Sequence, residues 1–349
     1  VDKAVALARR MAAGDALTGG ELLTLLEQRT AESAEILRAA AVETARKTFG
    51  NRVYLRGLIE FTNYCKNDCY YCGIRCSNQK AERYRLTPEV ILACCDAGYE
   101  LGFRTFVLQG GEDSWWTDDK LCSLIAAIKE NHPDCALTLS IGERSWDSYA
   151  ALKQVGADRY LLRHETANAC HYRRLHPPAL KLENRIRCLY DLKDLGYQVG
   201  AGMMVGAPGQ TLANLVEDLQ FLQTLQPHMV GMGPFLRHRD TPFANEPDGS
   251  AELTLYLLSM VRLLLPKVLL PATTALGTAL EGGRERGILH GANVVMPNLS
   301  PADVRSKYLL YHDKLATGAE SANGLAQLRR NLQAIGYEAV VARGDAPTL

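Results

Sequence analysis

Over the first fifty residues, apolar positions recur at the three- and four-residue spacing that places side chains on one face of a helix. Two stripes carry this spacing, with charged residues between them: Ala4, Leu7, Ala8 and Met11, and then Leu22, Leu23, Leu25 and Leu26. The pattern predicts that residues 1–50 form an N-terminal helical extension, which covers the domain that follows.

From Arg52 the pattern changes to short apolar runs that alternate with amphipathic helices, such as Leu212–Leu222. Eight runs are strand candidates: Val53–Phe61, Thr105–Gln109, Ala136–Ile141, Arg159–His164, Ala201–Val205, Met229–Gly233, Val268–Ala272 and Asn293–Met296. Eight strands, each followed by a helix, predict an α/β fold with a complete (β/α)8 TIM-type barrel over residues 51–311. The tail, residues 312–349, should be helical around Leu325–Leu332 and pack on the barrel. Chemistry is then expected at the carboxyl ends of the strands.

Composition narrows the possible partners. The 349 residues include 39 Lys and Arg and 39 Asp and Glu, which argues against nucleic-acid or anionic-membrane binding but allows a local basic pocket. Val1–Asp15 lacks the apolar core of a signal peptide, and Leu253–Leu276 is interrupted by charged residues and prolines. We therefore expect a cytoplasmic protein that does not enter a membrane.

All ten cysteines lie between Cys65 and Cys188, and three follow the first predicted strand as Cys65-x3-Cys69-x2-Cys72. Three thiolates at this spacing suit three corners of a [4Fe-4S] cluster and leave the fourth iron open for another ligand. The alternative is a closed cluster or a structural zinc site that uses Cys76 as the fourth ligand, in a non-catalytic metal-binding barrel. The loop resembles that of the radical S-adenosylmethionine (SAM) enzymes, in which an aromatic residue at the position of Tyr71 contacts the SAM adenine.

The next predicted strand ends in a second candidate motif, Gln109-Gly110-Gly111-Glu112. Glycines let a backbone approach a ligand closely, and the strand edge offers hydrogen bonds to the methionyl ammonium of SAM. A plain turn is the alternative. Glu165, after the fourth predicted strand, and Arg185, on the following helix, could hold the ribose and the methionyl carboxylate, although a surface salt bridge would also explain Arg185.

Taken together, the chain resembles the HydE family, the radical SAM maturases of [FeFe]-hydrogenase, within the group that includes biotin synthase and methylornithine synthase. The resemblance runs from about Gly50 to Tyr311. It is carried in order by Ile59–Asn63, Arg83–Arg85, Leu108–Asp113, Tyr160–Asn168, Glu183–Arg185, Gly200–Gly202, Met229–Phe235, Asp240–Pro242, Pro271–Ala275 and Gly291–Asn298.

The resemblance implies roles for further residues. Arg163, Thr273 and Thr274 would hold the carboxylate of a small substrate, Tyr308 would close that cavity, and Met296 would lie beside SAM. Core packing is the alternative for Met296 and Tyr308. The implied activity is reductive cleavage of SAM to a 5′-deoxyadenosyl radical, which acts on a cysteine-derived, iron-bound substrate in H-cluster assembly. It requires an external one-electron donor and suggests contact with other hydrogenase maturation proteins.

Two departures from the family matter. Some members carry three more cysteines near the C-terminus for a second cluster, but here no cysteine follows Cys188, so we expect one cluster. Val304 stands where some relatives have tyrosine. The alternative function is that of methylornithine synthase, a radical mutase acting on lysine, which the C-terminal Ala334-Ile335-Gly336-Tyr337 resembles. The sequences Arg163–Thr166 and Pro271–Thr274 favour the maturase.

Overall fold

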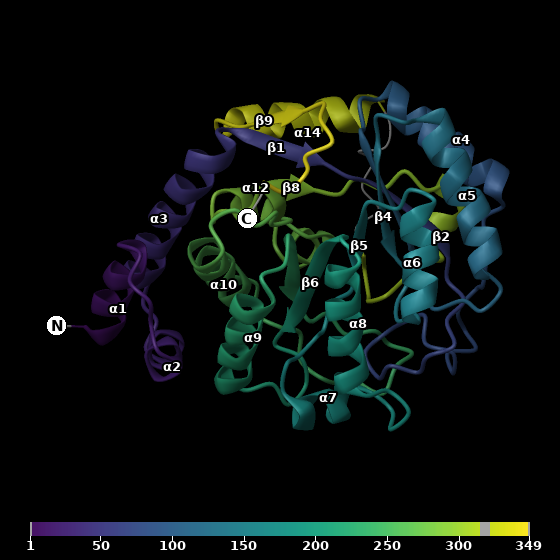
Figure 1. Ribbon diagram of the computed structural model, residues 1–349. Coiled ribbons are helices and arrows are strands. Elements are labelled where there is room, and N and C mark those ends of the chain that lie inside the picture. Colours follow the sequence, from purple (N-terminus) through teal and green to yellow (C-terminus); the bar gives the residue numbers. More distant parts are fainter. Residues whose placement is uncertain (1, 315–321, 348–349) are drawn as a thin grey trace.

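The computed structural model describes residues 2–314 and 322–347. Three helices begin the chain: α1 (Lys3–Ala12), α2 (Gly19–Glu27) and α3 (Ala31–Phe49). Each starts at a side chain that accepts hydrogen bonds from the first turn: Asp2, Thr18 and Thr30. Figure 1 shows the three helices along one flank of the molecule beside α10 (Ala251–Leu264), against which α3 packs. Helices therefore form over the first fifty residues, as the apolar stripes predict.

The main body is a six-stranded parallel sheet whose strands follow one another in chain order. Its strands are β2 (Gly57–Thr62), β3 (Thr105–Gly110), β4 (Ala136–Ser140), β5 (Arg159–Leu161), β6 (Gln198–Val205) and β7 (Met229–Pro234). Every side chain of β2 is buried, as expected for a parallel strand that is covered on both faces. The predicted α/β fold with a parallel sheet is confirmed.

A second sheet of three strands has the order β8 (Val294–Val295), β1 (Arg52–Leu55) and β9 (Glu338–Val340). The prediction of one strand over Val53–Phe61 is wrong, because the chain forms two strands that meet at Arg56 and pair in different sheets. The largely apolar stretch of residues 53–61 does not reveal such a break, since residues 53–55 of β1 and all of β2 are buried. The tail contributes strand β9, which pairs with β1, as well as a helix (Figure 1).

The segment predicted as the seventh strand, Val268–Ala272, forms isolated bridges. Leu269 pairs with Met229 of β7, and Pro271 pairs with Val294 of β8. Proline has no N–H to donate, which limits regular pairing at this position. Leu58 of β2 likewise bridges to Asn298, just after β8. Hydrogen-bonded contacts therefore continue from β7 through this segment and β8 to β2.

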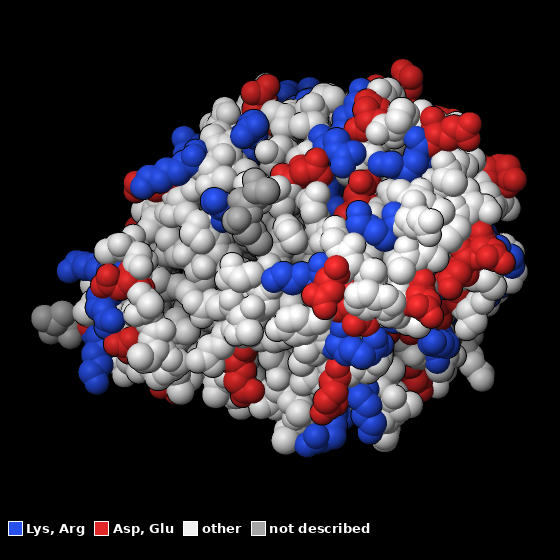
Figure 2. Space-filling model, viewed as in Figure 1, with Lys and Arg blue, Asp and Glu red and all other residues white. Residues whose placement is uncertain are grey.

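Helices pack around the sheets, and the main apolar core lies between the two layers. They are α4 (Pro88–Glu100), α5 (Asp118–Asn131), α6 (Trp146–Gln154), α7 (Ala169–Leu175), α8 (Leu182–Asp194), α9 (Leu212–Leu225), α11 (Thr274–Ala279), α12 (Gly283–Ile288), α13 (Ala302–Arg305) and α14 (Ala322–Ala334). In the described residues, no helix is both long and apolar enough to cross a membrane. Figure 2 shows Lys and Arg side by side with Asp and Glu across the visible face.

Candidate active site

The cysteine loop follows β2 and is held in place by backbone hydrogen bonds and one arginine. The Arg83 guanidinium donates to four carbonyl oxygens, those of Asn63, Ile74, Arg75 and Asn78, at 2.6–3.1 Å. Because these carbonyls lie on both sides of the three cysteines, Arg83 fixes the loop as a unit. This explains why Arg83 belongs to the motifs that the sequence singles out.

The three thiols lie in a surrounding that disfavours their charged form. Burial raises the pKa of Cys65 and Cys69, and it raises the pKa of Cys72 to about 12. A thiolate here requires a nearby positive charge, such as an iron ion, to compensate for lost hydration. The donor set therefore fits an iron–sulfur cluster, which would supply that charge.

Cys76, the alternative fourth ligand, is exposed. Among the described residues, no three His, Cys, Asp or Glu side chains lie close enough together to hold a single metal ion. The three thiols of a cubane cluster bind three different irons, so they need not converge on one point.

Tyr71 is positioned by a histidine. Its hydroxyl donates to Nε2 of His176 at 3.1 Å, while Nδ1 of His176 donates to the Tyr172 carbonyl at 2.9 Å. Burial lowers the pKa of His176 to about 4, so the ring is neutral and Nε2 accepts. His176 was not singled out by the sequence; a lone histidine beyond a helix gives no signal without the fold.

The Gly-Gly-Glu segment packs directly against the cysteine loop. A Cβ on Gly111 would lie 2.2 Å from the Tyr64 carbonyl oxygen and 2.7 Å from Cβ of Cys65, so only glycine fits there. The Lys66 N–H donates to the Glu112 carbonyl at 2.9 Å, and the Glu112 carboxylate accepts from the Glu143 N–H at 2.7 Å. Gly110 ends β3. The motif thus holds the loop against the end of β3.

Two cavities lie at the carboxyl ends of the strands and share Arg163, Ala275, Leu310 and Tyr311 in their linings. The outer chamber lies between the cysteine loop, the ends of β6 and β7, and the segment before Lys314. Its lining residues are Tyr71, Cys72, Arg163, Glu165, Met204, Gly233, Pro234, Phe235, Leu236, Ala275, Leu310 and Tyr311. The inner chamber lies among the strands: Leu58, Glu60, Gln109, Ser140, Leu161, Arg163, Ala201, Met229, Gly231, Pro271, Thr273, Thr274, Ala275, Met296, Leu310, Tyr311 and Lys314. Its volume is about 180 Å³.

Arg163 lines both chambers. One of its terminal nitrogens donates to the Glu165 carboxylate at 3.1 Å, while its Nε is buried and has no hydrogen-bond partner among the described residues. Arg185 donates to the Glu143 carboxylate at 2.8 Å and to the Arg163 carbonyl at 3.2 Å. The alternative of a surface salt bridge does not fit Arg185, because only 12% of its side chain is exposed. Arg163 therefore lies at the wall that the two chambers share, with an enclosed Nε that has no hydrogen-bond partner among the described residues.

Thr273 and Thr274 lie in the wall of the inner chamber, where Thr273 caps α11. Tyr308 is buried with its hydroxyl 3.5 Å from Nε2 of Gln109, which also lines the chamber. Met296 lines the inner chamber and not the outer one. The fold thus brings Arg163, Thr273 and Thr274 together in the wall of one cavity, although they come from distant parts of the chain, while Tyr308 lies behind Gln109 and does not line the cavity itself.

A buried ion pair in the inner chamber was not singled out as a site by the sequence analysis. The Glu60 carboxylate is fully buried, accepts from Nδ2 of Asn298 at 2.6 Å and pairs with Nζ of Lys314. Lys314 also donates to the Tyr308 carbonyl at 3.1 Å. A glutamate inside an apolar strand was a signal for Glu60, but nothing in the sequence indicates its partner, because 254 positions separate Glu60 from Lys314.

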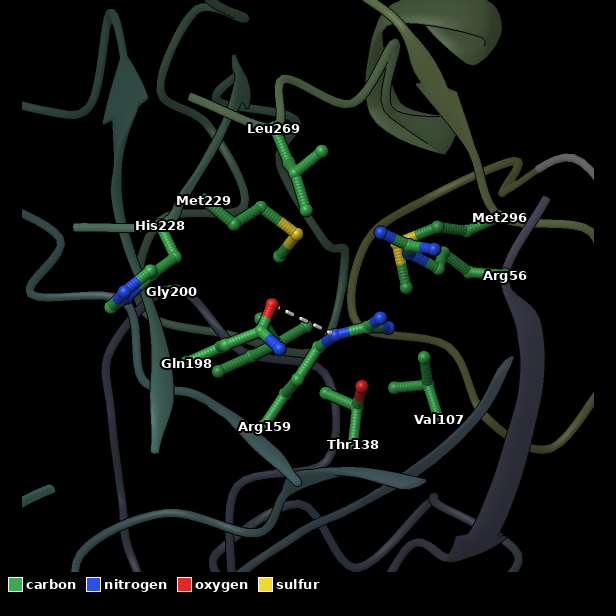
Figure 3. Close-up of a pocket in the computed structure, with 11 residues that line it drawn as sticks. Arg56, Val107, Thr138, Arg159, Gln198, Gly200, His228, Met229, Leu269 and Met296 are labelled. Atoms are coloured by element: carbon green, nitrogen blue, oxygen red, sulfur yellow. Dashed lines mark hydrogen bonds between the residues drawn. The ribbon is translucent and has the colours of Figure 1, made fainter. Parts of the chain in front are cut away.

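A third cavity, the floor cavity, lies at the amino ends of the strands (Figure 3). Leu161, Met229 and Met296 line both it and the inner chamber. Arg56 and Arg159 point toward each other across the floor cavity, and both are almost fully buried (Figure 3).

Comparison with known proteins identifies the chemistry of this site. The family model of the Radical SAM superfamily matches residues 59–222. The [FeFe] hydrogenase maturase subunit HydE of Thermotoga maritima is 45% identical over 314 residues, which cover 86% of this chain and 89% of that protein. The 3-methylornithine synthase of Methanosarcina barkeri is 32% identical over 86% of this chain and 85% of its own length.

Solved structures agree with this assignment. The crystal structure of methylornithine synthase has a TM-score of 0.84 at 29% identity and covers 96% of this chain and 97% of its own. The maturase HydG from Carboxydothermus hydrogenoformans has a TM-score of 0.81 over 96% of this chain and 78% of its own, and at 22% identity it supports the fold alone. The protein is a radical SAM enzyme. Within that superfamily, the chain belongs to the HydE family, as the sequence motifs predict.

Proposed function

We propose that this protein acts in assembly of the [FeFe]-hydrogenase H-cluster, on a small carboxylate-bearing substrate that is cysteine-derived and iron-bound. When bound, one [4Fe-4S] cluster and SAM supply a 5′-deoxyadenosyl radical by one-electron cleavage of SAM. The observation that carries the proposal is Arg163, which lines both chambers and keeps a buried donor free of protein partners. An arginine held in this way suits a carboxylate presented beside the SAM chamber.

The outer chamber would hold the cofactors. Cys65, Cys69 and Cys72 would bind three irons of the cluster, and the edge formed by Gln109, Gly110, Gly111 and Glu112 would receive the methionyl ammonium. Tyr71 would contact the adenine, with its orientation set by His176 at 3.1 Å. Glu165 would bind the ribose, and Arg185 would attract the methionyl carboxylate from within its pair with Glu143.

The inner chamber would hold the substrate. Arg163, Thr273 and Thr274 offer a guanidinium and two hydroxyls for a carboxylate, and all three line this cavity. Tyr308 would close the cavity above the Gln109 side chain. Met296, expected beside SAM, lines the inner chamber and the floor cavity but not the outer chamber, so it would separate the substrate from the floor cavity. Enclosure excludes water, which protects a radical from side reactions.

We further propose that the strands close into a complete eight-membered barrel over residues 51–311, flanked by the extension 1–50 and the tail 312–349. The support is the series of bridges that leads from β7 through Leu269 and Pro271 to β8, and from Asn298 to β2. An external one-electron donor and other maturation proteins would be its partners. All ten cysteines are free thiols, which supports work in the cytoplasm, where thiols stay reduced.

The test is anaerobic reconstitution with iron and sulfide. The wild type should bind about four irons per chain and cleave SAM when reduced by dithionite. Cys69→Ala should lose both the cluster and SAM cleavage, whereas Cys76→Ala, which removes an exposed thiol from the same loop, should keep both. SAM cleavage by reconstituted Cys69→Ala protein, or its loss in Cys76→Ala, would refute the ligand assignment.

The second candidate is a methylornithine-type mutase acting on lysine, favoured by the TM-score of 0.84 with methylornithine synthase. The two are separated by two assays on the same reconstituted protein. One incubates it with SAM, dithionite and lysine and looks for an isomerised amino acid. The other asks whether it replaces HydE in activating [FeFe]-hydrogenase. Activation without lysine isomerisation supports the maturase.

A further inference from the structure

In the loop after β5, successive side chains lie either at the chambers or in the protein interior. Arg163 and Glu165 face the chambers, while His164 between them points away and is fully buried. His164 is bonded in the chain to the two residues that line the chambers, so a contact that holds His164 limits where both neighbours can lie. The environment of His164 therefore bears on the two residues that line the chambers.

His164 is held by one partner on each ring nitrogen. The Gly202 N–H of β6 donates to Nδ1 at 3.3 Å, which assigns the ring proton to Nε2. Nε2 then donates to Oδ1 of Asp218 on α9 at 3.0 Å. Both side chains of this pair are 0% exposed.

Asp218 holds the same loop at a second point. Its Oδ1 also accepts from the Ala167 N–H at 2.7 Å, so one oxygen ties both ends of the segment from His164 to Ala167. Its Oδ2 is buried and has no hydrogen-bond partner in the described part of the chain. A buried carboxylate with an unused oxygen is costly, which indicates that it is kept for more than stability.

The segment between these two points carries backbone strain. Glu165 has a φ of 64°, in the left-handed region that a non-glycine side chain rarely adopts. Its N–H donates to the Gly202 carbonyl at 3.0 Å, and the next N–H, of Thr166, donates to the His164 carbonyl at 2.8 Å. Such a conformation persists only where surrounding contacts enforce it, and strain of this kind is typical of functional sites.

We propose that Asp218, acting through His164, is the positioning residue that fixes Arg163 and Glu165 at the wall shared by the outer and inner chambers. This inference rests on the proposed function, because it assigns Glu165 to the SAM ribose and Arg163 to the substrate. Losing the Asp218 contacts releases the strained turn, and both side chains then leave the positions that the two ligands require. Nucleoside affinity therefore depends on a carboxylate outside the chambers.

The experiment measures binding of S-adenosylhomocysteine to reconstituted full-length protein by calorimetry, which requires no turnover. Asp218→Ala should weaken binding by about ten-fold or more, in line with the loss of residues that orient ligand-binding groups elsewhere. Asp218→Asn, whose Oδ1 still accepts both hydrogen bonds, should restore most of the affinity. The matched control is Glu217→Ala, which removes the neighbouring carboxylate that binds Asn168 at 2.9 Å, outside the strained turn.

Iron content and the thermal unfolding midpoint are measured on the same samples, so that loss of fold is seen directly. If Asp218→Ala does not fold, His164→Asn takes its place, because asparagine can accept from Gly202 but does not reach Asp218. Unchanged affinity in a folded Asp218→Ala or His164→Asn protein, or equal weakening in Glu217→Ala, overturns the inference. A wild type that binds no S-adenosylhomocysteine refutes the proposed function itself.

Discussion

Arginines line cavities at both ends of the parallel strands, but the two ends treat them differently. At the amino ends, Arg56 donates to the carbonyls of Arg343 and Gly344, each at 2.7 Å, and Arg159 donates to Thr105, the Arg343 carbonyl and Asp345 at 2.7–2.9 Å. At the carboxyl ends, Arg163 has a buried Nε without a protein partner. A guanidinium satisfied by the chain stabilises the fold, whereas one left short of partners is available to a ligand.

The amino end is sealed by the last described residues of the tail. Gly344 has a φ of 60°, and a Cβ there would lie 2.6 Å from the Tyr54 ring and 2.7 Å from the Arg56 guanidinium. Only glycine lets the backbone come so close that its carbonyls reach both arginines. At the amino ends, backbone carbonyls together with the side chains of Thr105 and Asp345 accept from the arginines, whereas at the carboxyl ends Arg163 has a nitrogen without a protein partner.

The largest effect, on stability, should come from replacing Arg159, which lines the floor cavity. Arg159→Met removes a buried guanidinium that donates to Thr105, the Arg343 carbonyl and Asp345, and should lower the free energy of unfolding by about 3 to 4 kcal/mol. Urea unfolding measures this loss. Arg187→Met, which removes a 46% exposed arginine paired within α8, is the control and should change stability by about 0.5 kcal/mol or less. Equal losses in both variants would contradict the structural role of the floor.

Acid should lower the free energy of unfolding through His176, which holds Tyr71 at the outer chamber. Burial lowers its pKa from 6.5 to about 4, so between these values the unfolded chain binds a proton that the folded chain does not. This contribution is complete above pH 6.5 and is lost as the pH falls toward 4, by about 3 kcal/mol in total. His176→Gln should flatten the dependence of unfolding free energy on pH over this range.

Burial also lowers the pKa of His228, which lines the floor cavity, so His228→Gln is the matched variant at the other end. Urea unfolding at several pH values compares the two. If only His228→Gln flattens the profile, the acid sensitivity belongs to the floor and the prediction for His176 is wrong.

Replacing Arg163, which lines both chambers, should reduce activity and leave the stability of the fold unchanged. Arg163→Met should reduce hydrogenase activation in a maturation assay by about 100-fold, the equivalent of one or two hydrogen bonds to a charged group. Its thermal unfolding midpoint should stay near that of the wild type, in contrast to Arg159→Met. The control Arg237→Met, at a 49% exposed position, should activate normally. A large loss of stability in Arg163→Met would erase the contrast between the two ends.

The smallest effect is expected for Glu60 and Lys314. These two residues form a buried ion pair, and both also line the inner chamber. Either Glu60→Gln or Lys314→Met leaves a buried group without its partner, since the two side chains are 0% and 9% exposed. A double-mutant cycle by urea unfolding should give a coupling of about 1 to 3 kcal/mol. Additive losses would show that the pair is not coupled.

Much of the fold was predictable because local patterns reflect local physics. Helical stripes predicted the first three helices, and apolar runs located β3 to β7 within a few residues. The same reasoning joined β1 and β2 into one strand, since residues 53–55 and all of β2 are buried and follow one another closely in the sequence. It also could not foresee that Pro271 and its neighbours form bridges in place of a regular strand.

The site was predictable where its residues are close together in the sequence. The three cysteines lie within eight residues, and the Gly-Gly-Glu edge and the stretch from Arg163 to Glu165 are each contiguous, so each has a local pattern that chemistry explains. Only the fold revealed that His176 orients Tyr71 or that Asp218 holds His164, because each partner comes from another element and is an ordinary residue in its own local sequence.

The sequence by itself determined the class of chemistry, since the spacing of three thiols and of the residues near them is set by what they bind. The tertiary structure decided which charged side chains have hydrogen-bond partners within the protein. The sequence does not distinguish the roles of Arg56, Arg159 and Arg163. The folded chain brings carbonyls of residues 343–344 to the first two and leaves Nε of Arg163 without a partner among the described residues. Hydrogen bonding depends on distance in space, which the order of residues along a chain does not contain.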